Sequence, residues 1–117
     1  MKYFVMLAGD GDVGSWDKLS PEEQQAVMGQ FGAFDEACGQ RLGVELLGGE
    51  ALEDASVATT LRTRSGEVTV TDGPFTEATE QIGGFYLVEA PELDTIVELC
   101  RILPPYDIEI RPVVDFS

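Results

Sequence analysis

A chain of 117 residues has the length of one domain, so we expect a single domain over residues 1–117. Its 22 acidic and 7 basic residues give a formal net charge of −15, which argues against binding to nucleic acid or to anionic membranes, since both need a cationic surface. The same charge is typical of a solvated acidic surface, and it leaves open a protein partner with a basic face.

The cysteines and the absence of histidine leave few chemical options. Cys38 and Cys100 lie on the apolar stripes of two expected helices, which favours buried free thiols. Neither a Cys/His cluster nor a calcium-loop spacing occurs, so we expect no metal and no cofactor. No stretch approaches the roughly 18 apolar residues of a membrane helix, and the N-terminal run is too short for a signal peptide. We therefore expect a cytoplasmic protein.

The N-terminal third predicts a strand followed by a helix. Residues 2–8 form a short apolar run, typical of a central strand that is buried on both faces. Ser20, followed by Pro21 and by Glu23 three residues on, is a capping box and marks the start of a helix. The apolar stripe of this helix is expected to contain Val27, Phe31, Phe34, Cys38 and Leu42.

Glycines interrupt and then end this helix. Gly29 and Gly32 would allow a close approach between the helix and a sheet, and Gly43 suits a left-handed C-terminal turn. Residues 44–52 read as the next strand, in which Gly48 and Gly49 indicate a bulge.

The second half repeats the alternation of strand and helix. Residues 57–64 and 67–72 flank Ser65-Gly66 and predict a hairpin with a two-residue turn. Residues 84–90 are a further strand, Pro91 is expected to open a second helix that ends at Pro104, and the alternating residues 107–114 are the last strand. Ile108 and Ile110 are expected to point inward.

The expected order is therefore β-α-β, a hairpin, and β-α-β. We predict an α+β, ferredoxin-like fold with an antiparallel sheet and two helices on one face. The chain has no further element to cover the other face of the sheet. A homodimer that packs sheet on sheet would bury that face, and we expect one.

Asp72 stands at the end of the apolar row of its strand, on the face that also carries Val68 and Val70. An Asp commonly accepts a hydrogen bond from the backbone N–H two residues later, but that residue is Pro74, which has no N–H. The carboxylate then has two interpretations. Either Phe75 or Thr76 satisfies it within a rigid turn, or it is held at the rim of a pocket for acid/base chemistry or ligand binding.

Several motifs together resemble one known family. The stretches "TDGPFTEATEQIGGFYLVE", "KYFVML", "SPEE", "LLGGEAL" and "EIRPV" look like those of the YCII-related proteins, in the branch named for its DGPF motif. The resemblance covers nearly the whole chain. It implies a bacterial homodimer of the dimeric α/β-barrel class with no firmly assigned activity. In relatives, a His and an Asp near a cleft have suggested an enzyme, and some relatives are linked to extracytoplasmic-function sigma factors.

This chain departs from that pattern because it contains no histidine. A His-Asp mechanism and haem binding through a proximal His are therefore excluded. Of the residues that the resemblance suggests for catalysis, only Asp72 can be carried over to this sequence.

Three other side chains have a functional and a structural interpretation. Arg62 could bind an anionic ligand or pair with one of the many carboxylates. Tyr86 could donate a hydrogen bond into a cleft near Asp72, provided that their strands are neighbours, or it could pack in the core or the dimer face. Trp16 could cover a pocket, or it could act as a hydrophobic staple at the helix entrance.

The sequence supports two functional hypotheses. The first is a homodimer that binds a small molecule and is possibly a cofactor-free enzyme, with Asp72 as its catalytic carboxylate and Phe75 and Tyr86 lining the pocket. The alternative is a regulatory interaction protein that acts through its acidic surface on a sigma factor. The missing histidine weighs against catalysis, because it is the usual proton carrier at neutral pH.

Overall fold

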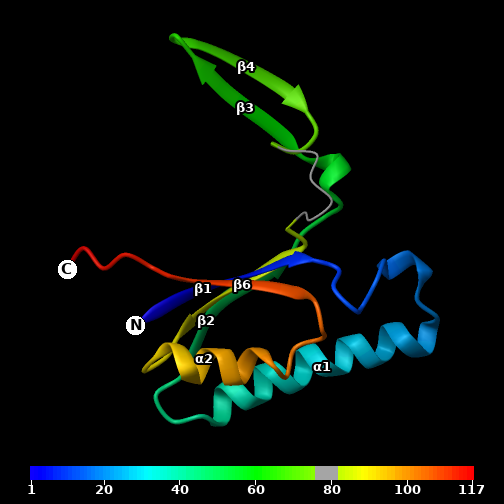
Figure 1. Cartoon of the computed structure of the whole chain (residues 1–117), viewed down its shortest axis with the longest axis vertical. Coiled ribbons are helices and arrows are strands. Elements are labelled where there is room, and N and C mark those ends of the chain that lie inside the picture. The colour runs from blue at the N-terminus through cyan, green and yellow to red at the C-terminus, as the bar shows by residue number, and fades with distance from the viewer. Residues whose placement is uncertain (76–81) are drawn as a thin grey trace.

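The computed structural model describes residues 1–75 and 82–117 and shows an open sheet, two helices and a projecting hairpin (Figure 1). The strands are β1 (Lys2–Gly9), β2 (Glu45–Ala51), β3 (Thr59–Arg64), β4 (Glu67–Asp72), β5 (Gly84–Glu89) and β6 (Asp107–Pro112). The helices are α1 (Pro21–Gln40) and α2 (Leu93–Cys100), with short 3-10 turns η1 (Trp16–Lys18) and η2 (Ala55–Val57).

The main sheet has the ferredoxin-like arrangement that the sequence predicts. Its order is β2-β5-β1-β6, and every neighbouring pair is antiparallel. The two β-α-β units interleave, because β5 lies between β1 and β2 while β6 pairs with the outer side of β1. The sheet is open and does not close into a barrel. A register shift between Leu46 and Gly48 confirms the expected bulge in β2.

Helix α1 begins where the capping box predicts. The Ser20 hydroxyl accepts a hydrogen bond from the Glu23 N–H at 3.1 Å, and the Glu23 carboxylate accepts one from the Ser20 N–H at 3.0 Å. The prediction for Leu42 was wrong: the helix ends at Gln40, and Leu42 is 94% exposed. The chain turns away immediately afterwards through Gly43, which has φ +81° as expected for a left-handed turn.

The glycines within α1 do not serve the close approach that was expected of them. A side chain added at Gly29 or Gly32 would meet no atom within 4 Å, since both positions lie on the solvent side of the helix.

The start of α2 also differs from the prediction. Glu92 is still extended, with φ −157° and ψ 166°, so the helix starts at Leu93. Pro91 instead packs on the turn after α1, where a Cβ at Gly43 would lie 3.0 Å from its ring.

The core lies between the sheet and the two helices. Alternate residues of β1 point into it, and their neighbours point away, so β1 is buried on one face only and not on both as expected. The reason is that both helices cover the same face of the sheet (Figure 1). The core residues are Tyr3, Val5, Leu7, Phe34, Cys38, Val88, Ala90, Ile96, Leu99, Cys100 and Leu103. Both cysteines are buried and free, as predicted.

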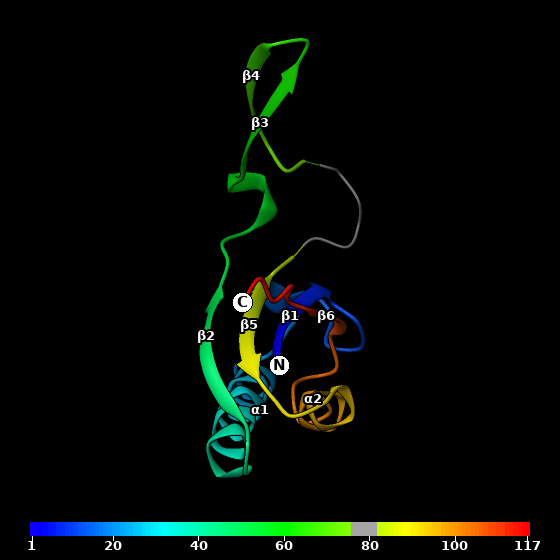
Figure 2. The ribbon, with the colours of Figure 1, turned by 90° about the vertical axis from the view of Figure 1, so that its left-hand side faces the viewer.

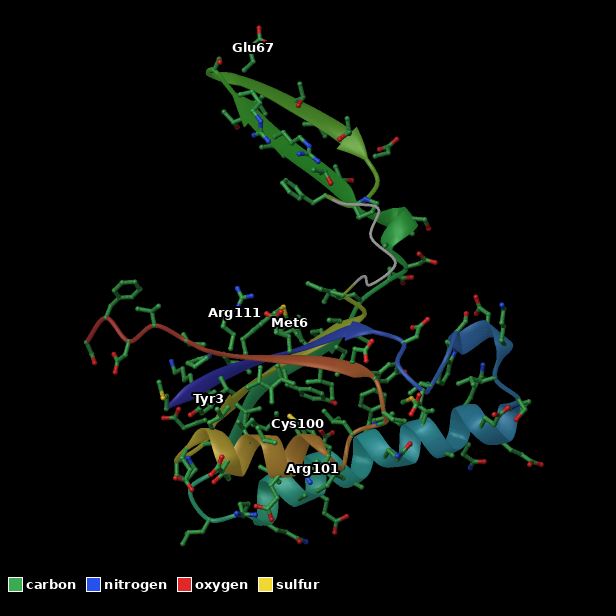
Figure 3. The ribbon with its side chains drawn as sticks, viewed as in Figure 1. Tyr3, Met6, Glu67, Cys100, Arg101 and Arg111 are labelled. Carbon is green, nitrogen blue, oxygen red and sulfur yellow. The ribbon has the colours of Figure 1, made fainter. Side chains whose placement is uncertain are left out.

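The other face of the sheet carries an apolar patch, which we call the open face: Phe4, Met6, Phe85 and Leu87. These side chains are half-buried, and the Phe4 and Phe85 rings stack with their centroids 5.4 Å apart. Figure 3 shows Met6 on this face, with Tyr3 and Cys100 on the helix side. No segment among residues 1–75 and 82–117 covers the open face in either view (Figures 1 and 2).

Strands β3 and β4 form a two-stranded sheet of their own, which we call the arm (Thr59–Asp72). Its turn has positive φ at both central residues, Ser65 at 52° and Gly66 at 81°, as the predicted two-residue hairpin requires. The arm rises from one end of the main sheet on the side away from the helices (Figures 1 and 2). The radius of gyration is accordingly 16.3 Å, against about 13 Å for a compact domain of this length.

Neither of the helices in the described part of the chain is long and apolar enough to cross a membrane.

Candidate functional site

The turn after β4 is fixed to the chain that enters β3. The Gly73 N–H donates to the Ala58 carbonyl at 2.7 Å, and the Thr60 hydroxyl donates to the Gly73 carbonyl at 2.7 Å. Gly73 has φ +105°, a conformation that side chains with a Cβ rarely adopt, so the turn requires glycine here. Thr60 is one of the few buried polar residues, and its hydroxyl is used entirely in this contact. The turn is therefore a rigid support for the residue before it.

That residue is Asp72, the last of β4, which pairs with Thr59 across the hairpin. Strand alternation puts it on the face of Val68 and Val70, as predicted, and it is exposed to solvent. Within the described residues its carboxylate has no hydrogen bond and no ion pair. Thr76, one of its expected partners, lies outside the described residues. The carboxylate is thus presented at the end of an apolar row.

Arg62 and Phe75 form a clamp on the opposite face of the arm. The Arg62 guanidinium donates to the Phe75 carbonyl at 2.7 Å, and its central carbon lies 4.2 Å from the centroid of the Phe75 ring. A cation over an aromatic face is favourable by about 0.5–1 kcal/mol at exposed sites. This contact differs from both interpretations of Arg62, and it holds the ring against the arm.

An open cavity of about 700 Å³ lies at the base of the arm. Its walls come from the chain that leaves β2, from the first residues of β3 and from the turn after β4. They are mostly apolar, and the lining residues are Leu52, Glu53, Asp54, Ala55, Val57, Ala58, Thr59, Thr60, Leu61, Pro74, Phe75 and Ile82. Phe75 is thus a wall residue of this cavity. Asp72 is not among the lining residues, but it pairs with Thr59, which is.

The charged side chains of the cavity wall are the carboxylates of Glu53 and Asp54, which lie at its rim. Asp54 is engaged by the Ser56 N–H at 3.0 Å, where it caps η2. Glu53 is exposed. Among the described residues, the charged residues of the wall are both acidic, and the Arg62 guanidinium next to the wall residue Leu61 is held by Phe75.

Tyr86 does not lie beside Asp72, because its strand is not a neighbour of β4. Strand β5 pairs with β1 and β2, whereas β4 pairs with β3. The Tyr86 ring points toward the helices, with its centroid 4.8 Å from that of Phe34. Burial, followed by the nearby Asp35 carboxylate and Cys38, raises the pKa of Tyr86 to about 12. This tyrosine is a partly buried core residue that keeps its proton at neutral pH.

Trp16 lies at the start of α1, away from the cavity. It begins η1, and its carbonyl accepts a hydrogen bond from the Gln24 side chain at 3.0 Å. This contact fixes the loop to the first turns of α1 through the backbone of Trp16 and not through its ring, since the residue is 42% exposed. Of the five candidate residues, the structure joins Arg62 to Phe75 and places Asp72 on the other face of the same arm, while Tyr86 and Trp16 lie in other parts of the fold.

The buried thiols are poor candidates for chemistry. Burial raises the pKa of Cys38 to about 11 and that of Cys100 to about 12. A thiol must lose its proton to act as a nucleophile, so both are inert at neutral pH. Within residues 1–75 and 82–117, no group of three His, Cys, Asp or Glu side chains could hold a metal ion.

Sequence reasoning missed several wall residues of the cavity, including Leu52, Ala58 and Ile82. Leu52 and Ile82 flank strand ends, where an apolar residue has no distinctive pattern. They are brought together at the root of the arm by a contact distant in sequence, in which the Leu52 N–H donates to the Gly83 carbonyl at 2.9 Å.

The interleaved sheet with both helices on one face defines an α+β protein of the ferredoxin-like class. The family model of the YCII-related domain matches residues 1–117, so the chain belongs to the YCII-related family. It is also 40% identical over 122 residues to an uncharacterised protein of Rhizobium meliloti (strain 1021), and the match covers 97% of this chain and 92% of that protein.

Proposed function

We propose that the chain forms a homodimer that binds a small molecule in the cavity at the base of the arm, with Asp72 as the polar anchor. The observation that carries this proposal is the cavity itself. Its volume of about 700 Å³ is large enough for a small molecule, and its walls are mainly apolar with a few polar groups at the edge.

The charges favour a neutral or cationic ligand with an apolar body. The wall carries Glu53 and Asp54 and no cation, and the whole chain has a net charge of −15. An anion would approach against this field, whereas an amine would be attracted. Arg62 would be a positioning residue here, because its guanidinium is engaged by Phe75.

Asp72 would accept a hydrogen bond from an N–H or O–H group of the ligand. The turn beside it is fixed by the contacts of Gly73 with Ala58 and Thr60, so the carboxylate would be held in place without being neutralised. In the enzymatic form of the proposal, Asp72 would take a proton from the bound molecule without any cofactor.

The dimer is supported by the open face. Phe4 and Phe85 stack on it, and Met6 and Leu87 extend the apolar patch. A contiguous apolar patch of this kind commonly marks a protein interface. A second copy of the chain that covers this patch would give the symmetric contact that is usual for homodimers.

A pair of dyes with the same aromatic body tests the ligand class. N-phenylnaphthylamine is neutral, and anilinonaphthalene sulfonate adds one negative charge. We expect the neutral dye to bind the protein at least tenfold more tightly, as measured by fluorescence titration. Ala58→Phe should abolish the fluorescence because it fills the cavity, and Ala33→Phe on the exposed side of α1 is the matched control. If Ala58→Phe and Ala33→Phe bound the neutral dye equally well, the proposed site would be contradicted.

The acidic surface supports the alternative function, a regulatory protein that acts on a sigma factor or a similar basic partner. The net charge of −15 is the observation in its favour. Such a complex should weaken as salt rises, because screening reduces the attraction between exposed charges. A pull-down with the sigma factor encoded nearest to this gene, at low and at high salt, tests it. Binding that does not depend on salt would exclude the acidic surface as the contact.

A further inference from the structure

We propose that the arm packs against the open face of a second copy of this chain, so that two arms are exchanged across the dimer. This inference rests on the proposed homodimer and specifies which surfaces meet. The arm supplies one apolar row, and the open face supplies the receiving surface.

The first argument is the apolar row on the arm. Leu61 pairs with Val70, and Val68 follows on the same face of the hairpin. These side chains are 62%, 63% and 56% exposed, respectively. Two-stranded hairpins that pack against nothing are only marginally stable in water. The arm therefore needs a surface to pack on, and within the described residues its own chain provides none for this row.

The second argument is the amount of exposed surface. The chain exposes 8198 Å², whereas a compact monomer of this mass exposes about 6,200 Å². The difference of about 2,000 Å² exceeds the roughly 800 Å² that each partner buries in a standard interface, and it falls in the range of obligate dimers. A small docked peptide would leave most of this surface exposed, and a second copy would cover both the arm and the open face.

The third argument is charge. Residues Thr59–Asp72 contain two arginines, Arg62 and Arg64, and two acids, Glu67 and Asp72, so the arm is neutral. The remainder of the chain carries the whole net charge of −15. The net charge outside the arm therefore opposes the association of two copies, and the arm adds nothing to this repulsion. An apolar, neutral arm is the part of the molecule that can approach a second acidic copy without an electrostatic cost.

The geometry permits the exchange. The arm rises on the side of the sheet away from the helices, which is also the side of the open face (Figures 1 and 3). Glu67 marks its tip, far from the sheet of its own chain (Figure 3). Because a twofold contact is reciprocal, each arm can lie on the sheet of the other copy.

One residue pair on β4 tests the inference with a matched control. Val70→Glu puts a charge into the apolar row, whereas Thr69→Glu puts the same charge on the opposite face one residue away. Both positions are exposed, so neither change should unfold the chain, which circular dichroism verifies. By light scattering across a dilution series, we expect Val70→Glu to raise the dimer dissociation constant at least tenfold and Thr69→Glu to leave it within threefold of wild type.

A disulfide test then locates the contact. Val68→Cys mixed with Met6→Cys should give a crosslinked pair containing one chain of each variant, and Thr69→Cys mixed with Met6→Cys should not. If Val70→Glu dimerises like wild type, or if only Met6→Cys chains link to each other, the arm exchange is overturned while the proposed dimer stands. If wild type is a monomer at all accessible concentrations, the proposed homodimer fails and the arm exchange fails with it.

Discussion

Replacing the adjacent glycines of β2, Gly48 and Gly49, by alanine should change the free energy of unfolding in opposite directions. A Cβ at Gly49 would lie 2.7 Å from the Phe85 carbonyl oxygen and 2.7 Å from Cδ1 of Tyr86. A Cβ at Gly48 would meet nothing within 4 Å. Neither glycine has a positive φ, so alanine strains the backbone at neither position. The difference between Gly49→Ala and Gly48→Ala therefore measures a steric clash alone.

The expected magnitudes follow from these contacts. The Phe85 carbonyl belongs to the backbone of the central β5 and cannot yield, so β2 or the Tyr86 ring must move. Overpacking of this kind costs about 1–3 kcal/mol. Gly48→Ala only reduces the conformational freedom of the unfolded chain, and this stabilises the folded state by about 0.4–1 kcal/mol. The two variants should thus differ by at least about 1.5 kcal/mol in the free energy of unfolding.

Urea unfolding followed by circular dichroism measures this difference. For a chain of this size, 1 kcal/mol corresponds to about 4 °C in the midpoint of thermal unfolding, so heating provides a second readout. If Gly49→Ala were as stable as Gly48→Ala, the close packing of β2 on Tyr86 would be refuted, and with it the placement of that tyrosine in the core.

Three further predictions concern the site and the thiols. Asp72→Asn should weaken binding of 1-naphthylmethylamine, an aliphatic amine that is cationic at neutral pH, about tenfold and binding of the neutral dye much less, by fluorescence titration; an equal loss for both would show that the residue is only structural. Arg62→Lys should speed hydrogen exchange at the base of the arm, since lysine cannot both cover the ring and keep the carbonyl bond, whereas Arg64→Lys, which loses only a contact to its neighbour, should not. The pKa values of about 11 for Cys38 and about 12 for Cys100 lie above the ordinary value of 9.0, so the folded state binds more protons above pH 9. The stability that these thiols contribute is fully present below about pH 9 and should be lost as the pH rises toward 11–12; a flat urea midpoint across that range would contradict their burial.

Local signals in the sequence predicted most of the helices, strands and turns well. The capping box at Ser20 and the turn at Ser65-Gly66 depend on contacts within a few residues, so they can be recognised from the sequence alone. Leu42 shows the limit of the same reasoning, because it continues a helical spacing after the helix has already ended at Gln40.

The separation of the arm from the main sheet could not be predicted, for a physical reason. Its strands alternate apolar and polar residues just as strands of a larger sheet do, and a period of two says nothing about which strand lies alongside. The expected proximity of Tyr86 to Asp72 depended on such a pairing and was not met. The contact of Arg62 with Phe75 also depends on the fold-back after Gly73, which no spacing encodes.

Two backbone hydrogen bonds at the root of the arm determine how it can move. One joins Gly73 to Ala58, and the other joins Leu52 to Gly83. The first belongs to the arm and the second to the sheet, so we expect the chain between them to act as a pivot for the arm. The cavity is lined from both sides of this pivot. A rotation of the arm about this pivot would change the distance between the cavity walls. A contact made at the tip of the arm would therefore affect ligand binding at its base.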